Sequence, residues 1–95
     1  MTEKQETRDN VVLIGKKPSM AYVMAVVTQF GSGQKEVHIK ARGRAISKCV
    51  DVAEISKNKF IQGAKITEIR VSTEQVTTEK NEKFGVSTIS ITLAK

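Results

Sequence analysis

Two short basic turns hold the residues best suited to chemistry in this sequence. One is Lys16-Lys17, directly before Pro18, and the other is Arg42-Gly43-Arg44. Each turn precedes a segment with helical spacing of apolar residues, and the free N–H groups and dipole at a helix start attract anions. Ammonium groups bind phosphate as point charges, and guanidinium groups bind it bidentately. The pattern therefore predicts two phosphate-binding turns. Ordinary solubilising charges are the weaker alternative, because cations are unfavourable at a helix start that binds no anion.

The distribution of charge supports this interpretation. The chain has 16 Lys and Arg residues against 10 Asp and Glu, a net charge of +6 and a sequence pI of about 9.7. Residues 16–48 contain only one acid, Glu36, and carry the whole excess on seven cations: Lys16, Lys17, Lys35, Lys40, Arg42, Arg44 and Lys48. A solvated surface usually mixes both signs, so this asymmetry indicates an acidic partner, most commonly nucleic acid.

The residue types argue against catalysis. The chain has one His and one Cys, and neither His38 nor Cys49 has the partners that a zinc site or a nucleophile–base pair requires. Cys49 falls on the apolar side of an expected helix, and we expect a core residue there. Phe60 and Phe84 are better assigned to packing than to base stacking, since aromatic residues make up only 4% of the chain. We expect no catalytic residue, no metal and no cofactor.

The apolar periodicity predicts the elements that must position the basic turns. We expect the order β-α-β-α-β-β, an α+β fold with a single mixed four-stranded sheet and two helices. The expected strands are residues 11–14, 37–41, 66–78 and 83–94, and the expected helices are residues 18–30 and 46–60. Met20, Val23, Met24, Val27 and Phe30 form the apolar side of the first helix, and Ile46, Cys49, Val50, Ala53 and Phe60 that of the second.

This arrangement makes three geometric predictions. Both basic turns follow adjacent strands of a β-α-β unit, so they should lie on the same side of the molecule and form one patch. The last two strands, of about 12 residues each, would reach roughly 40 Å. They should therefore protrude as a hairpin arm, a shape that fits a DNA groove. The alternation changes between Val71 and Val76, which predicts a bulge or twist in the third strand.

Length and composition indicate one small domain. We expect a flexible polar tail over residues 1–9 and a single domain over residues 10–95. No apolar stretch approaches 18 residues and no signal-peptide pattern is present, so we expect a soluble intracellular protein without a membrane partner. A core of this size is marginal alone, and pairing with a second copy would stabilise it.

Four stretches of the sequence resemble the Alba family of small archaeal chromatin proteins. They are residues 10–18 (Asn-Val-Val-Leu-Ile-Gly-Lys-Lys-Pro), 40–48 (Lys-Ala-Arg-Gly-Arg-Ala-Ile-Ser-Lys), 50–54 and 86–89. The resemblance implies a fold like the C-terminal domain of bacterial translation initiation factor three, assembled as a homodimer. It also implies a positively charged saddle whose hairpin arms reach along the minor groove of double-stranded DNA.

The resemblance further implies roles for individual residues. Lys16 and Lys17 match the DNA-contacting loop, and Lys16 matches a lysine whose acetylation weakens binding, which implies a lysine acetyltransferase and a deacetylase as partners. Arg42 and Arg44 match the second basic loop, and Phe60 matches an aromatic contact between neighbouring dimers. With these, the expected nucleic-acid-binding set is Lys16, Lys17, Lys40, Arg42, Arg44, Lys48, Lys80 and Lys83. The hairpin tip departs from the family pattern, because residues 79–85 contain two acids and no arginine.

The resulting hypothesis is an architectural chromatin protein of the cytoplasm, associated with the chromosome. It would bind double-stranded DNA through phosphates with little sequence specificity and compact it as a dimer, tuned by acetylation of Lys16. Two alternatives stay open at this stage. One is an RNA-binding protein that acts on structured RNA, because phosphate contacts do not distinguish DNA from RNA. The other is an interaction subunit whose basic patch docks on an acidic protein surface.

Overall fold

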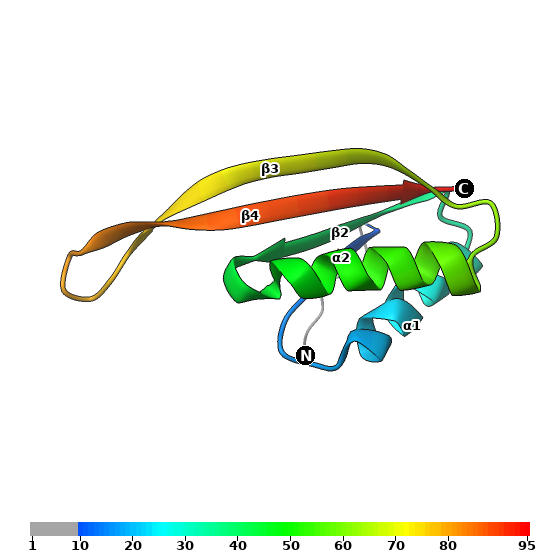
Figure 1. Cartoon of the computed structure of the whole chain (residues 1–95), viewed down its shortest axis with the longest axis horizontal. Coiled ribbons are helices and arrows are strands. Elements are labelled where there is room, and N and C mark those ends of the chain that lie inside the picture. The colour runs from blue at the N-terminus through cyan, green and yellow to red at the C-terminus, as the bar shows by residue number, and fades with distance from the viewer. Residues whose placement is uncertain (1–9) are drawn as a thin grey trace.

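The strands and helices follow one another in the predicted order. A computed structural model describes residues 10–95 (Figure 1). Its strands form one mixed sheet in the order β1-β2-β4-β3, which confirms the predicted α+β fold. The elements are β1 (Val11–Leu13), α1 (Ser19–Gly31), β2 (Glu36–Arg42), the 3₁₀ turn η1 (Gly43–Ala45), α2 (Ile46–Ile55), the π-helical turn η2 (Ser56–Phe60), β3 (Lys65–Thr77) and β4 (Lys83–Ala94).

The register of the sheet sorts apolar residues onto one face. β1 runs parallel to β2, with Val12 opposite Ile39. β4 runs antiparallel to β2 and places Leu93 opposite Val37. Because side chains alternate along a strand, these residues all point to the same side of the sheet. Val37, Ile39 and Leu93 are fully buried there, so this face is the floor of the hydrophobic core.

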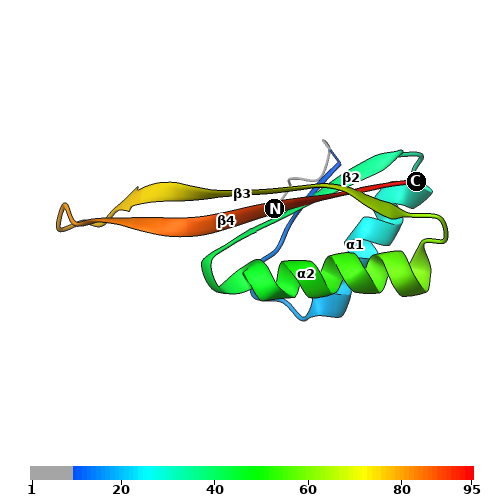
Figure 2. The ribbon, with the colours of Figure 1, turned by 45° about the horizontal axis from the view of Figure 1, so that its top comes forward.

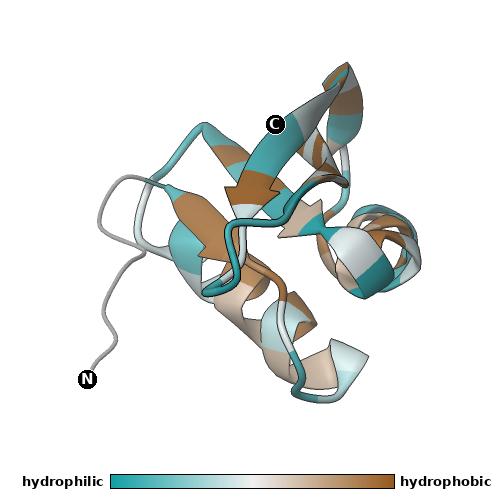
Figure 3. Cartoon of the chain, turned by 90° about the vertical axis from the view of Figure 1, so that its left-hand side faces the viewer, coloured by the Kyte–Doolittle hydropathy of each residue, from teal (hydrophilic) through white to brown (hydrophobic). Residues whose placement is uncertain are grey.

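Both helices cover that face (Figures 2 and 3). α1 buries Val23 and Val26 against the sheet. α2 buries Cys49 and Val52, as well as Ala53. The opposite face of the sheet carries no helix among residues 10–95, so most of its side chains remain open to solvent, although Thr92 on this face is buried. The two-layer arrangement therefore separates an apolar core from a largely polar face that no helix covers.

The helices differ from prediction at their ends and edges. The first helix begins at Ser19, and Pro18 is its N-cap residue instead of lying in the first turn. The second helix ends in the π-helical turn η2, whose extra residue rotates the chain. As a result Ser56 is buried, whereas Phe60, expected on the apolar side, is 45% exposed. The apolar side is also narrower than predicted, since Val50 is 42% exposed. In the first helix Met20 and Met24 are likewise about half exposed.

β3 and β4 form the predicted arm (Figure 1). β4 pairs with β2 only as far as the Thr88–Arg42 pair. From Thr73–Ser87 to Thr77–Lys83, the two strands pair only with each other. The molecule is 47 Å long but only 27 by 21 Å in its other dimensions. The arm therefore extends well beyond the body of the protein.

A bulge occurs in β3, but not at the point where the alternation changes. The register between β3 and β4 shifts between Ile66 and Glu68. Beyond that shift the pairing is regular as far as Thr77, so Val76 simply faces the side opposite to Val71. The bulge acts earlier: the extra residue, Thr67, lets Ile66 and Ile69 both point to the helix-covered face.

Candidate nucleic-acid interface

The first basic turn is a short loop between β1 and α1. Lys16 and Lys17 are both exposed on it. The N–H groups of Gly15 and Lys17 donate to the hydroxyl of Tyr22, at 2.9 and 3.1 Å. The ammonium of Lys48 donates to the carbonyl oxygens of Gly15, at 3.1 Å, and Lys17, at 2.7 Å. Tyr22 therefore accepts from two N–H groups of the loop and Lys48 donates to two of its carbonyl oxygens, while the side chains of Lys16 and Lys17 are exposed to solvent.

The second basic turn joins β2 to α2. Arg42 is the last residue of β2, and Arg44 lies within the 3₁₀ turn η1. Gly43 between them has a positive φ of +59°, a conformation that strongly favours glycine. Arg42 and Arg44 are both exposed. The glycine thus lets the chain turn sharply while it presents two guanidinium groups.

The topology brings the two basic turns together. β1 and β2 are parallel neighbours, and the Ile14 N–H donates to the Lys40 carbonyl at 2.8 Å where the two strands end. Lys48, in the first turn of α2, contacts the Lys17 carbonyl of the other turn. Lys16, Lys17, Arg42, Arg44 and Lys48 therefore lie at one end of the sheet. We call this set the basic end.

The arm projects from the same end of the sheet. β2 points toward its basic turn, and β3 and β4 continue past it in that direction (Figure 1). Lys80 lies in the turn at the arm's tip and Lys83 begins β4, so these two predicted residues are remote from the basic end. The tip also carries Glu79 and Glu82, which offset the charge of the two lysines.

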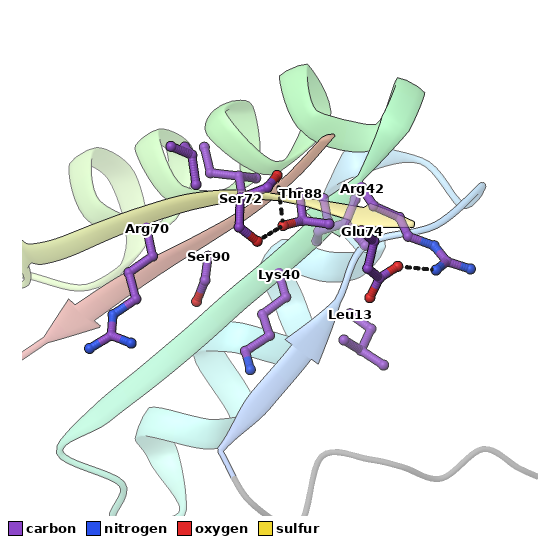
Figure 4. A pocket seen from close by; sticks show the side chains of 12 residues that line it. Leu13, Lys40, Arg42, Arg70, Ser72, Glu74, Thr88 and Ser90 are labelled. Carbon is purple, nitrogen blue, oxygen red and sulfur yellow. Dashed lines mark hydrogen bonds and ion pairs between the residues drawn. The ribbon is translucent and has the colours of Figure 1, made fainter. Parts of the chain in front are cut away.

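A shallow groove lies on the open face of the sheet, beside the basic end (Figure 4). Lys40 and Arg70 flank Ser90 there, in one row across β2, β4 and β3. Arg42 lies one row further along, and its guanidinium forms an ion pair with Glu74 at 2.7 Å. Lys40 thus faces this groove and not the loops, which places it at the border of the basic end.

Sequence reasoning missed three residues of this region. Tyr22 and Glu74 contact the basic turns, and Arg70 lines the groove. The charge of Arg70 within a Thr-rich strand was a visible signal. The contacts of Tyr22 and Glu74 form between residues that are distant in the sequence or in different strands, so no local sequence pattern predicts them.

Cys49 is in the core as expected. Its side chain is fully buried, and its thiol donates to the Ile39 carbonyl at 3.4 Å. Burial raises the pKa of the Cys49 thiol to about 11. Since the thiolate is the reactive form of cysteine, this residue serves packing.

Residues 10–95 lack two further classes of feature. No group of three or more His, Cys, Asp or Glu side chains in this range is placed to hold a metal ion. No helix in the same range is long and apolar enough to cross a membrane.

The sequence and the fold both match one family. Residues 10–73 match the family described as Alba. "DNA/RNA-binding protein Alba" of Methanocella arvoryzae is 53% identical over 87 residues, covering 92% of this chain and 91% of the relative. The protein of the same name from Methanothrix thermoacetophila is 54% identical, with 92% and 97% covered. These relatives are named as nucleic-acid-binding proteins and not as enzymes.

Two solved structures share this fold. Alba from Thermoplasma volcanium superposes with a TM-score of 0.83 at 52% identity, covering 90% of this chain and 99% of that one. ALBA1 from Trypanosoma brucei superposes with a TM-score of 0.74 at 26% identity, covering 90% and 68%. The similarity in fold therefore extends to a distant relative.

Proposed function

The chain belongs to the Alba family, and on that premise we propose that it is an architectural protein that binds double-stranded DNA through its phosphates. One observation carries the proposal: both basic turns lie at the end of the sheet from which the arm projects. Cations beside an extended ribbon suit a duplex, whose backbone meets the charges while the ribbon follows a groove. The names of the relatives, which include DNA and RNA binding, support the same class of partner.

The binding mechanism is the release of counterions from the duplex. If each subunit neutralises about four to five phosphates, a dimer makes roughly eight to ten contacts, and affinity falls steeply with salt. Phosphate contacts position a protein without reading bases, so sequence preference is weak. Glu79 and Glu82 at the tip of the arm reduce its attraction to DNA.

The proposed binding unit is a homodimer. Ile69 and Val71 point to the helix-covered side of the sheet but are 56% and 73% exposed. They remain uncovered because α2 packs on β2 and β4, whereas β3 is the outer strand. A second copy of the chain that covers these residues would enlarge a core that is small for a lone domain.

Regulation and assembly complete the proposal. Lys16 is exposed on its loop, and its acetylation by a lysine acetyltransferase would remove one positive charge per subunit until a deacetylase restored it. Phe60 is 45% exposed at the end of η2, where it is available for contact between neighbouring dimers on DNA. We place the protein on the chromosome in the cytoplasm, where it compacts DNA.

The test is a gel-shift titration of a random-sequence duplex from about 50 to 200 mM salt, the range in which phosphate-dominated affinity changes by orders of magnitude. The Lys16→Ala/Lys17→Ala variant should bind more weakly, with a salt slope lower by about one for each phosphate that the variant no longer neutralises. The matched control is Lys35→Ala/Lys65→Ala, which removes the same charge at the opposite end of the sheet. Equal reductions of affinity in both variants would mean that only net charge matters, and unchanged affinity in both would overturn the proposal.

RNA is the second candidate partner, favoured by the names of the relatives. Competition between a duplex DNA and a structured RNA at fixed salt decides between the two. Preferential retention of the RNA would assign the basic end to RNA binding, with the same residues in contact with phosphate.

A further inference from the structure

Two backbone N–H groups of the Gly15–Lys17 loop are hydrogen-bonded within the protein. The hydroxyl of Tyr22 accepts the N–H groups of Gly15 and Lys17. These two donors are therefore not available to a phosphate, although free N–H groups before a helix would ordinarily bind one. Phosphate binding at this loop must then rest mainly on the side chains of Lys16 and Lys17, whose positions depend on how firmly the backbone is held.

Lys48 holds the same backbone from the acceptor side. Its ammonium donates to the carbonyl oxygens of Gly15 and Lys17. Lys48 lies in the first turn of α2, where the helix dipole disfavours a cation. Two carbonyl acceptors compensate for that unfavourable position, and the residue is partly buried. The two carbonyl contacts therefore account for a lysine at the start of this helix.

The loop is built around this double contact. A Cβ added at Gly15 would lie 3.2 Å from the Tyr22 hydroxyl oxygen, closer than most Cβ atoms approach a neighbour. Tyr22 itself packs against the hydrophobic core from α1. Tyr22 thus connects the loop to α1, and Lys48 connects it to α2.

We infer that Tyr22 and Lys48 are positioning residues that pre-order the Gly15–Lys17 loop for phosphate. Lys48 acts on nucleic acid through the loop and not as an independent phosphate contact. The inference rests on the proposed nucleic-acid function. Its physical basis is entropic: a loop already fixed in its binding conformation loses little further conformational freedom when the ligand arrives.

The first test is a double-mutant cycle with the same random-sequence duplex at about 100 mM salt. Tyr22→Phe keeps the ring and removes only the hydroxyl, and Lys48→Met keeps most of the side-chain volume. Each should weaken binding by about fivefold, the effect of removing hydrogen bonds that each contribute little. In the Lys16→Ala/Lys17→Ala background each substitution should change the affinity by less than about twofold, because the lysine side chains that Tyr22 and Lys48 position are then absent. Lys35→Met is the control for the removal of one charge.

The second test needs no nucleic acid. Hydrogen exchange of the Gly15 and Lys17 amides should accelerate in Tyr22→Phe, while the amides of Val23 and Val26 in the core keep their protection. A general decrease in stability would accelerate both sets, so the comparison separates a clamp from a merely structural role.

The outcomes are distinguishable. If Lys48→Met weakens binding equally in both backgrounds, Lys48 contacts phosphate itself and the inference is wrong. Unchanged exchange at Gly15 and Lys17 in Tyr22→Phe would also overturn it. If Lys16→Ala/Lys17→Ala leaves affinity intact, the proposed function fails instead, and the exchange experiment still decides whether the clamp exists.

Discussion

Arg42 and Glu74 form an ion pair across an intervening strand. Arg42 ends β2 and Glu74 belongs to β3, yet the guanidinium Nη1 and the carboxylate Oε1 lie 2.7 Å apart above β4. The side chains are 66% and 55% exposed, so solvent screens the pair and its contribution to stability is small. Under the proposed function its consequence for binding is larger, because Glu74 would compete with phosphate for Arg42.

Glu74→Gln should therefore strengthen binding to duplex DNA. We expect an affinity gain of about two- to tenfold at low salt, since the phosphate no longer displaces a carboxylate. Gel shifts across salt measure the effect. Glu36→Gln is the control: it makes the same charge change at the first residue of β2, at the opposite end of the sheet from the basic end. Equal gains in both variants would show that net charge alone is responsible.

Val71→Lys should disrupt the proposed dimer. Val71 is 73% exposed on the helix-covered side of β3, and a charge on each subunit would be desolvated and repelled at a shared interface. We expect sedimentation velocity to show a dimer for the unmodified chain and a monomer for the variant. Leu13→Lys, a similar change at a 60% exposed residue on the open face, should leave the dimer intact. A dimer that survives Val71→Lys would place the interface elsewhere.

Gly85→Ala should distort the arm without unfolding the body. The added Cβ would lie 2.8 Å from the Thr73 Cγ2 across the hairpin, too close for two carbon atoms, so one of these two exposed residues must shift. Both residues lie in the part of the arm that pairs only with itself. Amide exchange should accelerate in residues 73–87 while the melting temperature changes little.

The rescue of this variant is specific. Adding Thr73→Ser removes the opposing methyl group and should restore the exchange rates of the arm. If the double variant behaves like Gly85→Ala alone, the cause is the backbone and not the contact with Thr73.

Cys49 should make stability fall at high pH. Burial raises the pKa of the thiol from its ordinary 9.0 to about 11, so the unfolded chain loses its proton first. Stability from this group is complete below about pH 9 and is lost as the pH rises toward about 11, by about 3 kcal/mol in all. Urea unfolding at pH 8 and pH 10.5 measures it. The decrease should be smaller in Cys49→Ala, and a parallel decrease in both proteins would assign it to other groups.

The fold was largely predictable because its signals are local. Alternation marked Val37, Ile39 and Ala41 as a strand, and the Ile-, Val- and Thr-rich C-terminal segments were long enough to imply an arm. The exposure of Phe60 was not predictable, since it follows from the π-helical turn η2, and the helical spacing of apolar residues does not reveal such a turn. Likewise, a periodic pattern alone does not tell which residues at the edge of the apolar side, such as Val50, remain uncovered.

The basic turns were predictable for a similar reason, and their supporting contacts were not. Parallel pairing of β1 and β2 follows from the β-α-β order, and it suffices to bring Lys16 and Arg42 to one end. The Arg42–Glu74 pair instead requires the register of three strands, including the bulge at Thr67. Lys48 reaches a carbonyl 31 residues away in the chain, and its sequence position suggested a phosphate contact.

The continuity of β4 also has a mechanical consequence. The same strand forms half of the arm and, from Thr88 to Ala94, lies hydrogen-bonded between β2 and β3. A pull on the tip is directed along the strand, so the bonds of this ladder share the load and must shear together, where a force across the strand would unzip them in turn. A load applied at the tip is thus transmitted along β4 into the part of the sheet that packs against the hydrophobic core.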